Sequence, residues 1–130
     1  MENILDANNA SLVLITRNEK PNRQVIDHFL LKEFACRDMS EIVIISYKLL
    51  HHLDIARRMY GKPMIITSGY RTVSYNKNIG GHPYSHHLTG NAVDLDIPED
   101  YSLEKSLVTT CMTVFPYCRV MTDYIHVDCR

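Results

Sequence analysis

Side chains that can bind a metal ion gather in two short stretches of the sequence. In the first, residues 85–94, His87 precedes Asp94 by seven positions. In the second, residues 123–128, a histidine, His126, stands between aspartates. Imidazole nitrogens and carboxylate oxygens are ligands of zinc, and a catalytic zinc site keeps one position free for water. These residue types predict a metal site if the fold brings the two stretches together.

The first stretch ends in an expected strand. Residues 92–97 alternate between apolar and acidic side chains, which is typical of a half-buried strand, and Asp94 and Asp96 fall on its polar face. Gly90 permits a tight turn just before this strand. His87 and Asp94 can therefore point to the same side of the chain.

A second strand is expected over residues 124–129. On a strand, side chains two positions apart share a face, so His126 and Asp128 would point the same way. If this strand lies beside the first, His126 can meet His87 and Asp94. The metal site thus depends on the pairing of two segments that are distant in the sequence.

The rest of the chain is expected to form a small α+β domain. The residue pattern predicts a helix over residues 47–60, capped by Ser46, and another after Ser102. The polar stretch 69–89 has no apolar periodicity and is expected to be a loop, and long loops are usually functional. Extended segments are expected at residues 12–15, 42–45, 64–68 and 119–121, and an irregular or helical segment at 25–36. This order favours a small, mainly antiparallel sheet packed against helices.

The composition excludes several classes of protein. The chain has 130 residues with 14 Lys+Arg against 15 Asp+Glu, so it lacks the basic excess of a nucleic-acid-binding protein. No apolar run approaches the roughly 20 residues of a membrane span. No secretory signal is visible, which predicts synthesis in the cytoplasm. The four cysteines form no CxxC pair and are expected to be free thiols.

Several motifs together resemble those of a known family. The pattern SxHxxGxAxD at residues 85–94, followed by HxD at residues 126–128, resembles peptidase family M15, the zinc D-Ala-D-Ala carboxypeptidases of the hedgehog/DD-peptidase fold. The segment ITSGYRT at residues 66–72 also matches the family, as do Asn76, Gly80-Gly81 and the segment 28–34. The resemblance covers roughly residues 27–130, which are expected to be the peptidase domain. Residues 1–26 are an N-terminal extension without an assigned function.

The resemblance implies one zinc ion per chain, bound by His87, Asp94 and His126. Members of the family use an acidic residue three positions before the last histidine ligand as general base, and Asp123 stands there. Asp128 is the alternative base, although its expected role is to hold a histidine ring in orientation.

The resemblance also implies residues that contact the substrate. Arg71 matches the family's substrate-binding arginine, whose donors suit a carboxylate or a developing oxyanion. Tyr70 is expected to line the cleft beside it. Ser85 is expected to orient the metal-binding aspartate or the loop backbone. His86 is a rival metal ligand by position only, because the spacing of the motif selects its neighbour.

The implied activity is that of a zinc metallopeptidase acting on peptidoglycan stem peptides. It would be a D-Ala-D-Ala carboxypeptidase or a phage-type murein endopeptidase. A catalytic domain without a wall-binding module suits an endolysin-like protein that degrades the cell wall after release, or a component of a phage particle. The alternative is a non-catalytic zinc-binding module of the same fold, acting in binding or as a structural or virion component. The presence of both Asp123 and Arg71 favours the enzyme.

Overall fold

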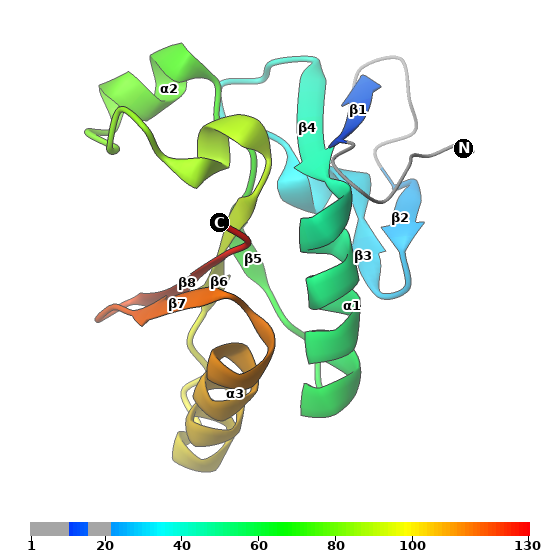
Figure 1. The fold of residues 1–130 in the computed structure, drawn as a ribbon, viewed down its shortest axis with the longest axis vertical. Coiled ribbons are helices and arrows are strands. Elements are labelled where there is room, and N and C mark those ends of the chain that lie inside the picture. The colour runs from blue at the N-terminus through cyan, green and yellow to red at the C-terminus, as the bar shows by residue number, and fades with distance from the viewer. Residues whose placement is uncertain (1–10, 16–21) are drawn as a thin grey trace.

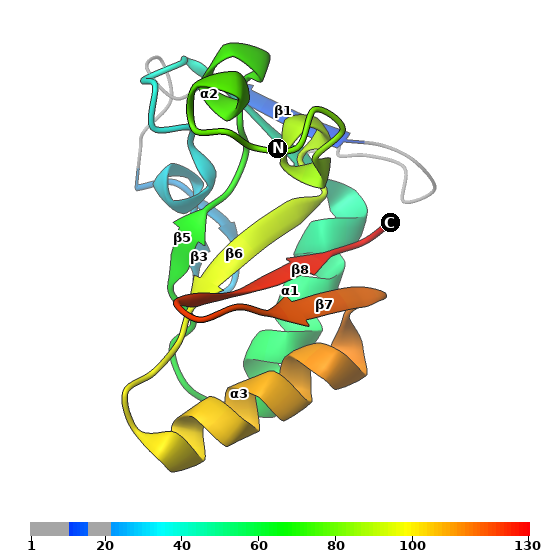
Figure 2. The same ribbon diagram turned by 90° about the vertical axis from the view of Figure 1, so that its left-hand side faces the viewer.

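The computed structural model describes residues 11–15 and 22–130. The main sheet consists of four strands from the second half of the chain. The strand order is β5-β6-β8-β7, and every neighbouring pair is antiparallel (Figures 1 and 2). The strands are β5 (Ile66–Ser68), β6 (Ala92–Asp96), β7 (Tyr117–Val120) and β8 (Tyr124–Asp128). Together with the helices, this sheet confirms the expected α+β class.

The central pair of this sheet, β6 and β8, separates apolar from polar side chains. Leu95 pairs with Ile125 across the two strands, and both side chains are fully buried in the core. Asp94 pairs with His126 in the adjacent row, on the opposite face. One face of the sheet therefore belongs to the core, and the other carries the residues that were expected to bind a metal.

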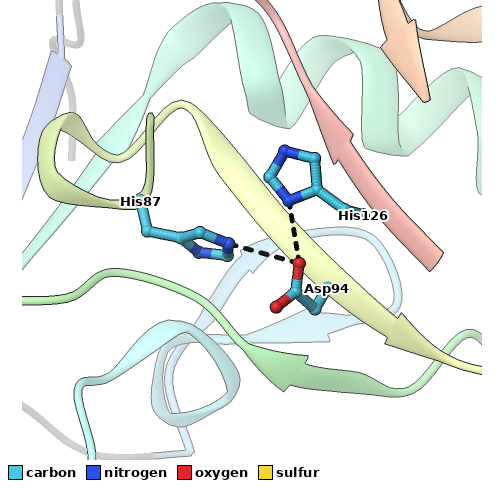
Figure 3. A group of neighbouring side chains, drawn as sticks. All are labelled: His87, Asp94 and His126. Atoms are coloured by element: carbon cyan, nitrogen blue, oxygen red, sulfur yellow. Dashed lines mark hydrogen bonds and ion pairs between the residues drawn. The ribbon is translucent and has the colours of Figure 1, made fainter. Parts of the chain in front are cut away.

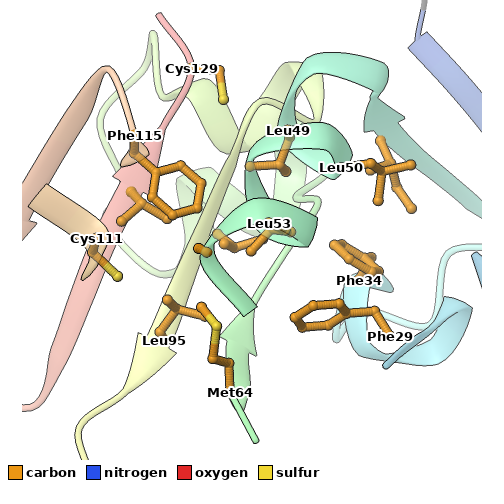
Figure 4. Close-up of a cluster of buried hydrophobic side chains, with 14 of the residues drawn as sticks. Phe29, Phe34, Leu49, Leu50, Leu53, Met64, Leu95, Cys111, Phe115 and Cys129 are labelled. Atoms are coloured by element: carbon orange, nitrogen blue, oxygen red, sulfur yellow. The ribbon is translucent and has the colours of Figure 1, made fainter. Parts of the chain in front are cut away.

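Helix α1 (Tyr47–Tyr60) covers the apolar face of the sheet and lies behind it in Figure 2. It begins where expected, because the Ser46 hydroxyl accepts a hydrogen bond from the Leu49 amide at 3.1 Å. It ends at Gly61, whose φ of 73° is the left-handed conformation that glycine adopts without strain. Its inner face includes Leu49 and Leu53, which pack in the core shown in Figure 4.

Helix α3 (Tyr101–Val114) packs beside α1 and begins differently from the expectation. Asp100, and not Ser102, is the N-cap, because its carboxylate accepts from the amides of Ser102 and Leu103 at 2.9 and 3.0 Å. Ser102 lies in the first turn and donates its hydroxyl to the same carboxylate. An ionised cap also stabilises the positive end of the helix.

The expectation of a loop over residues 69–89 is wrong in two places. A short helix, α2 (Val73–Asn78), follows Thr72, whose hydroxyl accepts from the Tyr75 amide. A 3₁₀ helix, η2 (His86–Thr89), comes before β6. Both elements are too short to show apolar periodicity, and side-chain caps define their starts instead.

The first part of the described chain forms two small antiparallel pairs. Strand β1 (Ser11–Ile15) pairs with β4 (Ile42–Ser46), which confirms both expected extended segments. Strand β2 (Gln24–Ile26) pairs with β3 (Phe29–Leu30), and the 3₁₀ helix η1 (Leu31–Phe34) follows. Residues 25–36 are thus a hairpin and one helical turn. None of the helices in the described part of the chain has the length and apolarity to cross a bilayer.

Candidate metal centre

Three side chains from separate elements converge on the polar face of the main sheet. His87 comes from η2, Asp94 from β6 and His126 from β8 (Figure 3). His87 Nε2 lies 3.2 Å from Asp94 Oδ1, and His126 Nδ1 lies 2.9 Å from the same oxygen. One nitrogen or oxygen atom from each residue falls within 4.8 Å of the others, a spacing at which all three can bind one ion.

A glycine fixes the position of His87 relative to the sheet. Gly90 ends η2 with a φ of 73°, and its carbonyl accepts from the Ser46 amide at 2.8 Å. A Cβ atom at this position would lie 2.2 Å from the carbonyl oxygen of Ile44. The glycine of the SxHxxGxAxD pattern therefore meets two needs, a left-handed turn and close packing against β4.

The ring of His87 is oriented by a backbone carbonyl. Its Nδ1 lies 2.7 Å from the carbonyl oxygen of Gly69, and the ring is 2% exposed. Because a carbonyl only accepts hydrogen bonds, Nδ1 carries the hydrogen and donates it. In the neutral ring, the lone pair of Nε2 then points toward Asp94.

His126 is oriented by a second carboxylate. Its Nε2 lies 2.8 Å from Oδ2 of Asp128, which is fully buried. Arg130 donates to both oxygens of Asp128, at 3.0 and 2.9 Å. Burial alone would raise the pKa of Asp128, but the hydrogen bonds from Arg130 and His126 outweigh it and lower that pKa. The ionised Asp128 accepts from Nε2, so Nδ1 of His126 presents its lone pair to Asp94.

This arrangement leaves three electron-rich atoms facing one another. In the neutral rings, His87 Nε2 and His126 Nδ1 have no hydrogen to offer to Asp94 Oδ1, which also only accepts. A cation between them satisfies all three atoms. Two imidazoles and one carboxylate form a donor set that zinc accepts, with room for a further ligand. The residues therefore fit a zinc ion.

The pKa values reflect the same need for positive charge. Burial would raise the pKa of Asp94, but the contacts of its carboxylate with the rings of His126 and His87 outweigh it and lower that pKa to about 2. Burial would lower the pKa of His126, but hydrogen bonds to the two aspartates outweigh it and raise that pKa. A proton on His126 thus competes with a metal ion for the same atoms.

Arg71 holds the other side of Asp94. It donates to Asp94 Oδ2 at 3.3 Å, to Asn76 Oδ1 at 3.1 Å and to Ser68 Oγ at 3.2 Å. Asn76 is buried and donates in turn to the carbonyl of His82 at 2.8 Å. Arg71 therefore fixes the rotation of the Asp94 carboxylate, so that Oδ1 faces the two histidines.

The three residues lie at the wall of a cleft with a volume of about 620 Å³. The cleft is open to solvent and is large enough for a segment of a peptide. Arg71 also lines it. The other lining residues include His82, Tyr84, His86, Arg119, Met121 and Tyr124.

The other residues singled out in the sequence have different positions. The Ser85 hydroxyl accepts from the His87 amide, so it caps η2 and orients the loop backbone. His86 lines the cleft but lies outside the group of three. Tyr70 packs against the hydrophobic core. It is not one of the described residues that line the cleft. Asp123 is exposed in the β7–β8 turn and is likewise absent from that lining.

Sequence reasoning did not single out two arginines of the cleft. Arg130 follows His126 and Asp128 at steps of two, so the strand period could have placed all three on one face. Its guanidinium also stacks 3.8 Å from the centre of the Tyr117 ring. Arg119 reaches the cleft only through the pairing of β7 with β8, which leaves no local signal in the sequence.

Comparison with protein families gives a match over most of the chain. The model of a family described as Peptidase M15 matches residues 27–128, which is most of the chain. None of the curated proteins matches the chain. The matched span contains His87, Asp94 and His126 together with the carboxylate of Asp128.

Proposed function

The chain belongs to peptidase family M15, and on that premise we propose that it is a zinc-dependent peptidase acting on peptidoglycan. Its substrates are amide bonds in the stem peptides, cleaved as by a D-Ala-D-Ala carboxypeptidase or a phage-type murein endopeptidase. The convergence of His87, Asp94 and His126 at the wall of an open cleft carries this proposal. The site of action is the cell wall, reached after release or from a phage particle.

In this proposal, His87 Nε2, Asp94 Oδ1 and His126 Nδ1 would hold the zinc ion. Zinc bound there would act as a Lewis acid that activates water and polarises the amide carbonyl. Asp128 keeps the hydrogen of His126 on the nitrogen that faces away from the site. Arg71 lines the cleft while it holds Asp94, so its guanidinium can also stabilise negative charge on the carbonyl oxygen.

Asp123 is the proposed proton acceptor, on the strength of its spacing from His126. Its carboxylate is exposed near Tyr124 and Met121, which both line the cleft. Catalytic contacts of this kind are often long before the substrate binds and tighten in the complex. Asp128 is poorly suited to the role, because it is buried and bonded to His126 and Arg130.

A second candidate function is a non-catalytic zinc-binding module of the same fold. One observation favours it: among the described residues that line the cleft, Asp94 is the sole carboxylate, and it belongs to the metal centre. In this case the cleft would bind a peptide, or serve a structural role in a virion, without hydrolysis.

Digestion of purified peptidoglycan separates the two functions. The zinc-loaded protein is incubated with the wall polymer, and the released fragments are identified by mass spectrometry. We expect peptide fragments or free D-alanine from the wild type and none from His126→Ala, which lacks a ligand. Tight zinc binding without any released fragment would favour the non-catalytic module. A wild type that neither binds zinc nor releases fragments would refute both functions.

A further inference from the structure

The wall of the cleft includes an arginine on β7 that no motif singles out. Arg119 on β7 pairs directly with His126 on β8, and His126 pairs with Asp94 on β6. Directly paired residues of neighbouring strands project from the same face, with Cβ atoms about 4.5–5.5 Å apart. Arg119 therefore stands in the same row of the sheet as Asp94 and His126, two of the three residues proposed to bind zinc, and it lines the cleft.

Arg119 differs from the other two arginines of the cleft in its contacts. The guanidinium of Arg71 donates hydrogen bonds to Ser68, Asn76 and Asp94. The guanidinium of Arg130 donates to both oxygens of Asp128. Within the part of the chain that the structure describes, no hydrogen bond or ion pair engages the Arg119 side chain. It is exposed and keeps its full set of donors for a ligand.

The charges around the cleft favour an anionic ligand. Arg71, Arg119 and Arg130 line it, and among the described lining residues Asp94 is the sole carboxylate. Both oxygens of Asp94 already face cationic partners or the metal position. An excess of positive charge in a concave site attracts anions, and a free guanidinium fork matches a carboxylate in shape and charge.

The reach of Arg119 limits where that carboxylate lies in a peptide. Neighbouring strands are about 4.7–4.9 Å apart, and an extended peptide advances roughly 3.3–3.6 Å per residue. An amide bond placed at His87, Asp94 and His126 thus has the next residue of the peptide within reach of the Arg119 side chain.

This inference rests on the proposed function and names the determinant of its specificity. We propose that Arg119 binds a carboxylate of the peptide on the residue that follows the scissile amide bond. Arg119, rather than Arg71, would then set the preference for acidic peptides. The carboxylate is either the free C-terminus of the leaving residue, as in a carboxypeptidase, or the side chain of an acidic residue inside the peptide, as in an endopeptidase.

Two pairs of peptides test the proposal and distinguish the two sources. The first pair is an N-acetylated peptide that ends in D-Ala-D-Ala, with a free C-terminal carboxylate or a carboxamide. The second pair has a blocked C-terminus and carries D-Glu or D-Gln after the scissile bond. Dissociation constants are measured by calorimetry with the zinc-loaded protein, and kcat/KM is measured for each peptide that is cleaved.

We expect the wild type to prefer the carboxylate in one of the pairs by about 10- to 100-fold, the usual range for a charged hydrogen bond. Arg119→Gln should bring this ratio close to 1, and Arg119→Lys should restore part of it. Arg58→Gln removes the same charge from the exposed face of α1 and should keep the wild-type ratio. Thermal melting checks that all variants are folded.

The proposal is overturned if Arg119→Gln keeps the preference, or if the wild type binds all four peptides equally or none of them. A preference in binding that depends on Arg119, without hydrolysis of any peptide, would support the carboxylate site and refute the peptidase activity. The failure of one proposal is therefore distinguishable from the failure of the other.

Discussion

Asp94 and His126 lie directly opposite each other on β6 and β8, and 2.9 Å separates Asp94 Oδ1 from His126 Nδ1. The antiparallel register turns two positions 32 residues apart into immediate neighbours. Because side chains alternate between faces, a slip of one residue would turn one of the two toward the core. The hydrophobic pairing of Leu95 with Ile125 therefore also fixes the metal centre.

The first prediction concerns the metal ligands. We expect about one equivalent of zinc per chain in the purified protein, and loss of that zinc in His87→Ala, Asp94→Ala and His126→Ala, because each removes one of three ligands. Metal analysis after dialysis measures the zinc content of each protein. His86→Ala is the matched control, since His86 lines the same cleft outside the group of three and should keep the zinc. Stoichiometric zinc in His126→Ala would refute the assignment.

The second prediction separates the two aspartates around His126. Asp123→Asn should keep zinc and the fold but lower hydrolysis by about 10²–10⁴-fold, the range typical of a general base. The rate is measured on a peptidoglycan peptide at saturating zinc. The prediction fails if the variant hydrolyses the peptide as fast as the wild type.

Asp128→Asn should act on the metal instead. Its carboxylate orients His126 at 2.8 Å, and loss of such a partner typically costs about 10- to 100-fold in metal affinity. Zinc affinity is measured by competition with a chelator. An Asp128→Asn protein with wild-type zinc affinity and no activity would mean that the two aspartates exchange roles.

The third prediction concerns Gly90, in the turn before β6, and uses Gly61, at the end of α1, as its matched control. Gly61→Ala should cost about 1–2 kcal/mol of unfolding free energy, because φ is 73° and nothing lies within 4 Å of the added Cβ. Gly90→Ala has the same φ and also places its Cβ 2.2 Å from the Ile44 carbonyl oxygen, so we expect a further loss of about 1–3 kcal/mol. Urea unfolding measures both variants, and equal losses would show that the contact with β4 relaxes freely.

Strong local signals made much of the fold predictable. The Ser46 cap and the apolar spacing of residues 47–60 predict α1, and the alternation of residues 92–97 predicts β6. The same alternation predicts that the Asp94 side chain points away from the core. These features depend on neighbouring residues alone, which is why the sequence suffices for them.

Features that depend on distant contacts were less predictable. The α2 helix rests on a single cap, and residues 69–89 look like a loop because they are polar throughout. The position of Arg119 in the cleft follows from the β7–β8 register and not from its own neighbours. The contact of Arg71 with Asp94 likewise depends on the pairing of β5 with β6, which brings two distant parts of the sequence together.

The last prediction concerns the cysteines, all four of which are free thiols. Burial raises the pKa of Cys111 to about 12 and that of Cys129 to about 11. Both thiols are therefore neutral at pH 8. Only the thiolate reacts with a disulfide reagent, so their reaction should be slow in the native protein and complete in guanidinium.

The same two thiols also make stability depend on pH. Because an unfolded thiol ionises near pH 8.5, the native state keeps these protons to a higher pH than the unfolded state does. Their contribution to stability is thus full below about pH 8.5 and is lost as the pH rises toward 12. Fewer than four reactive thiols after unfolding, or a melting temperature that does not fall between pH 8.5 and 11, would contradict this account.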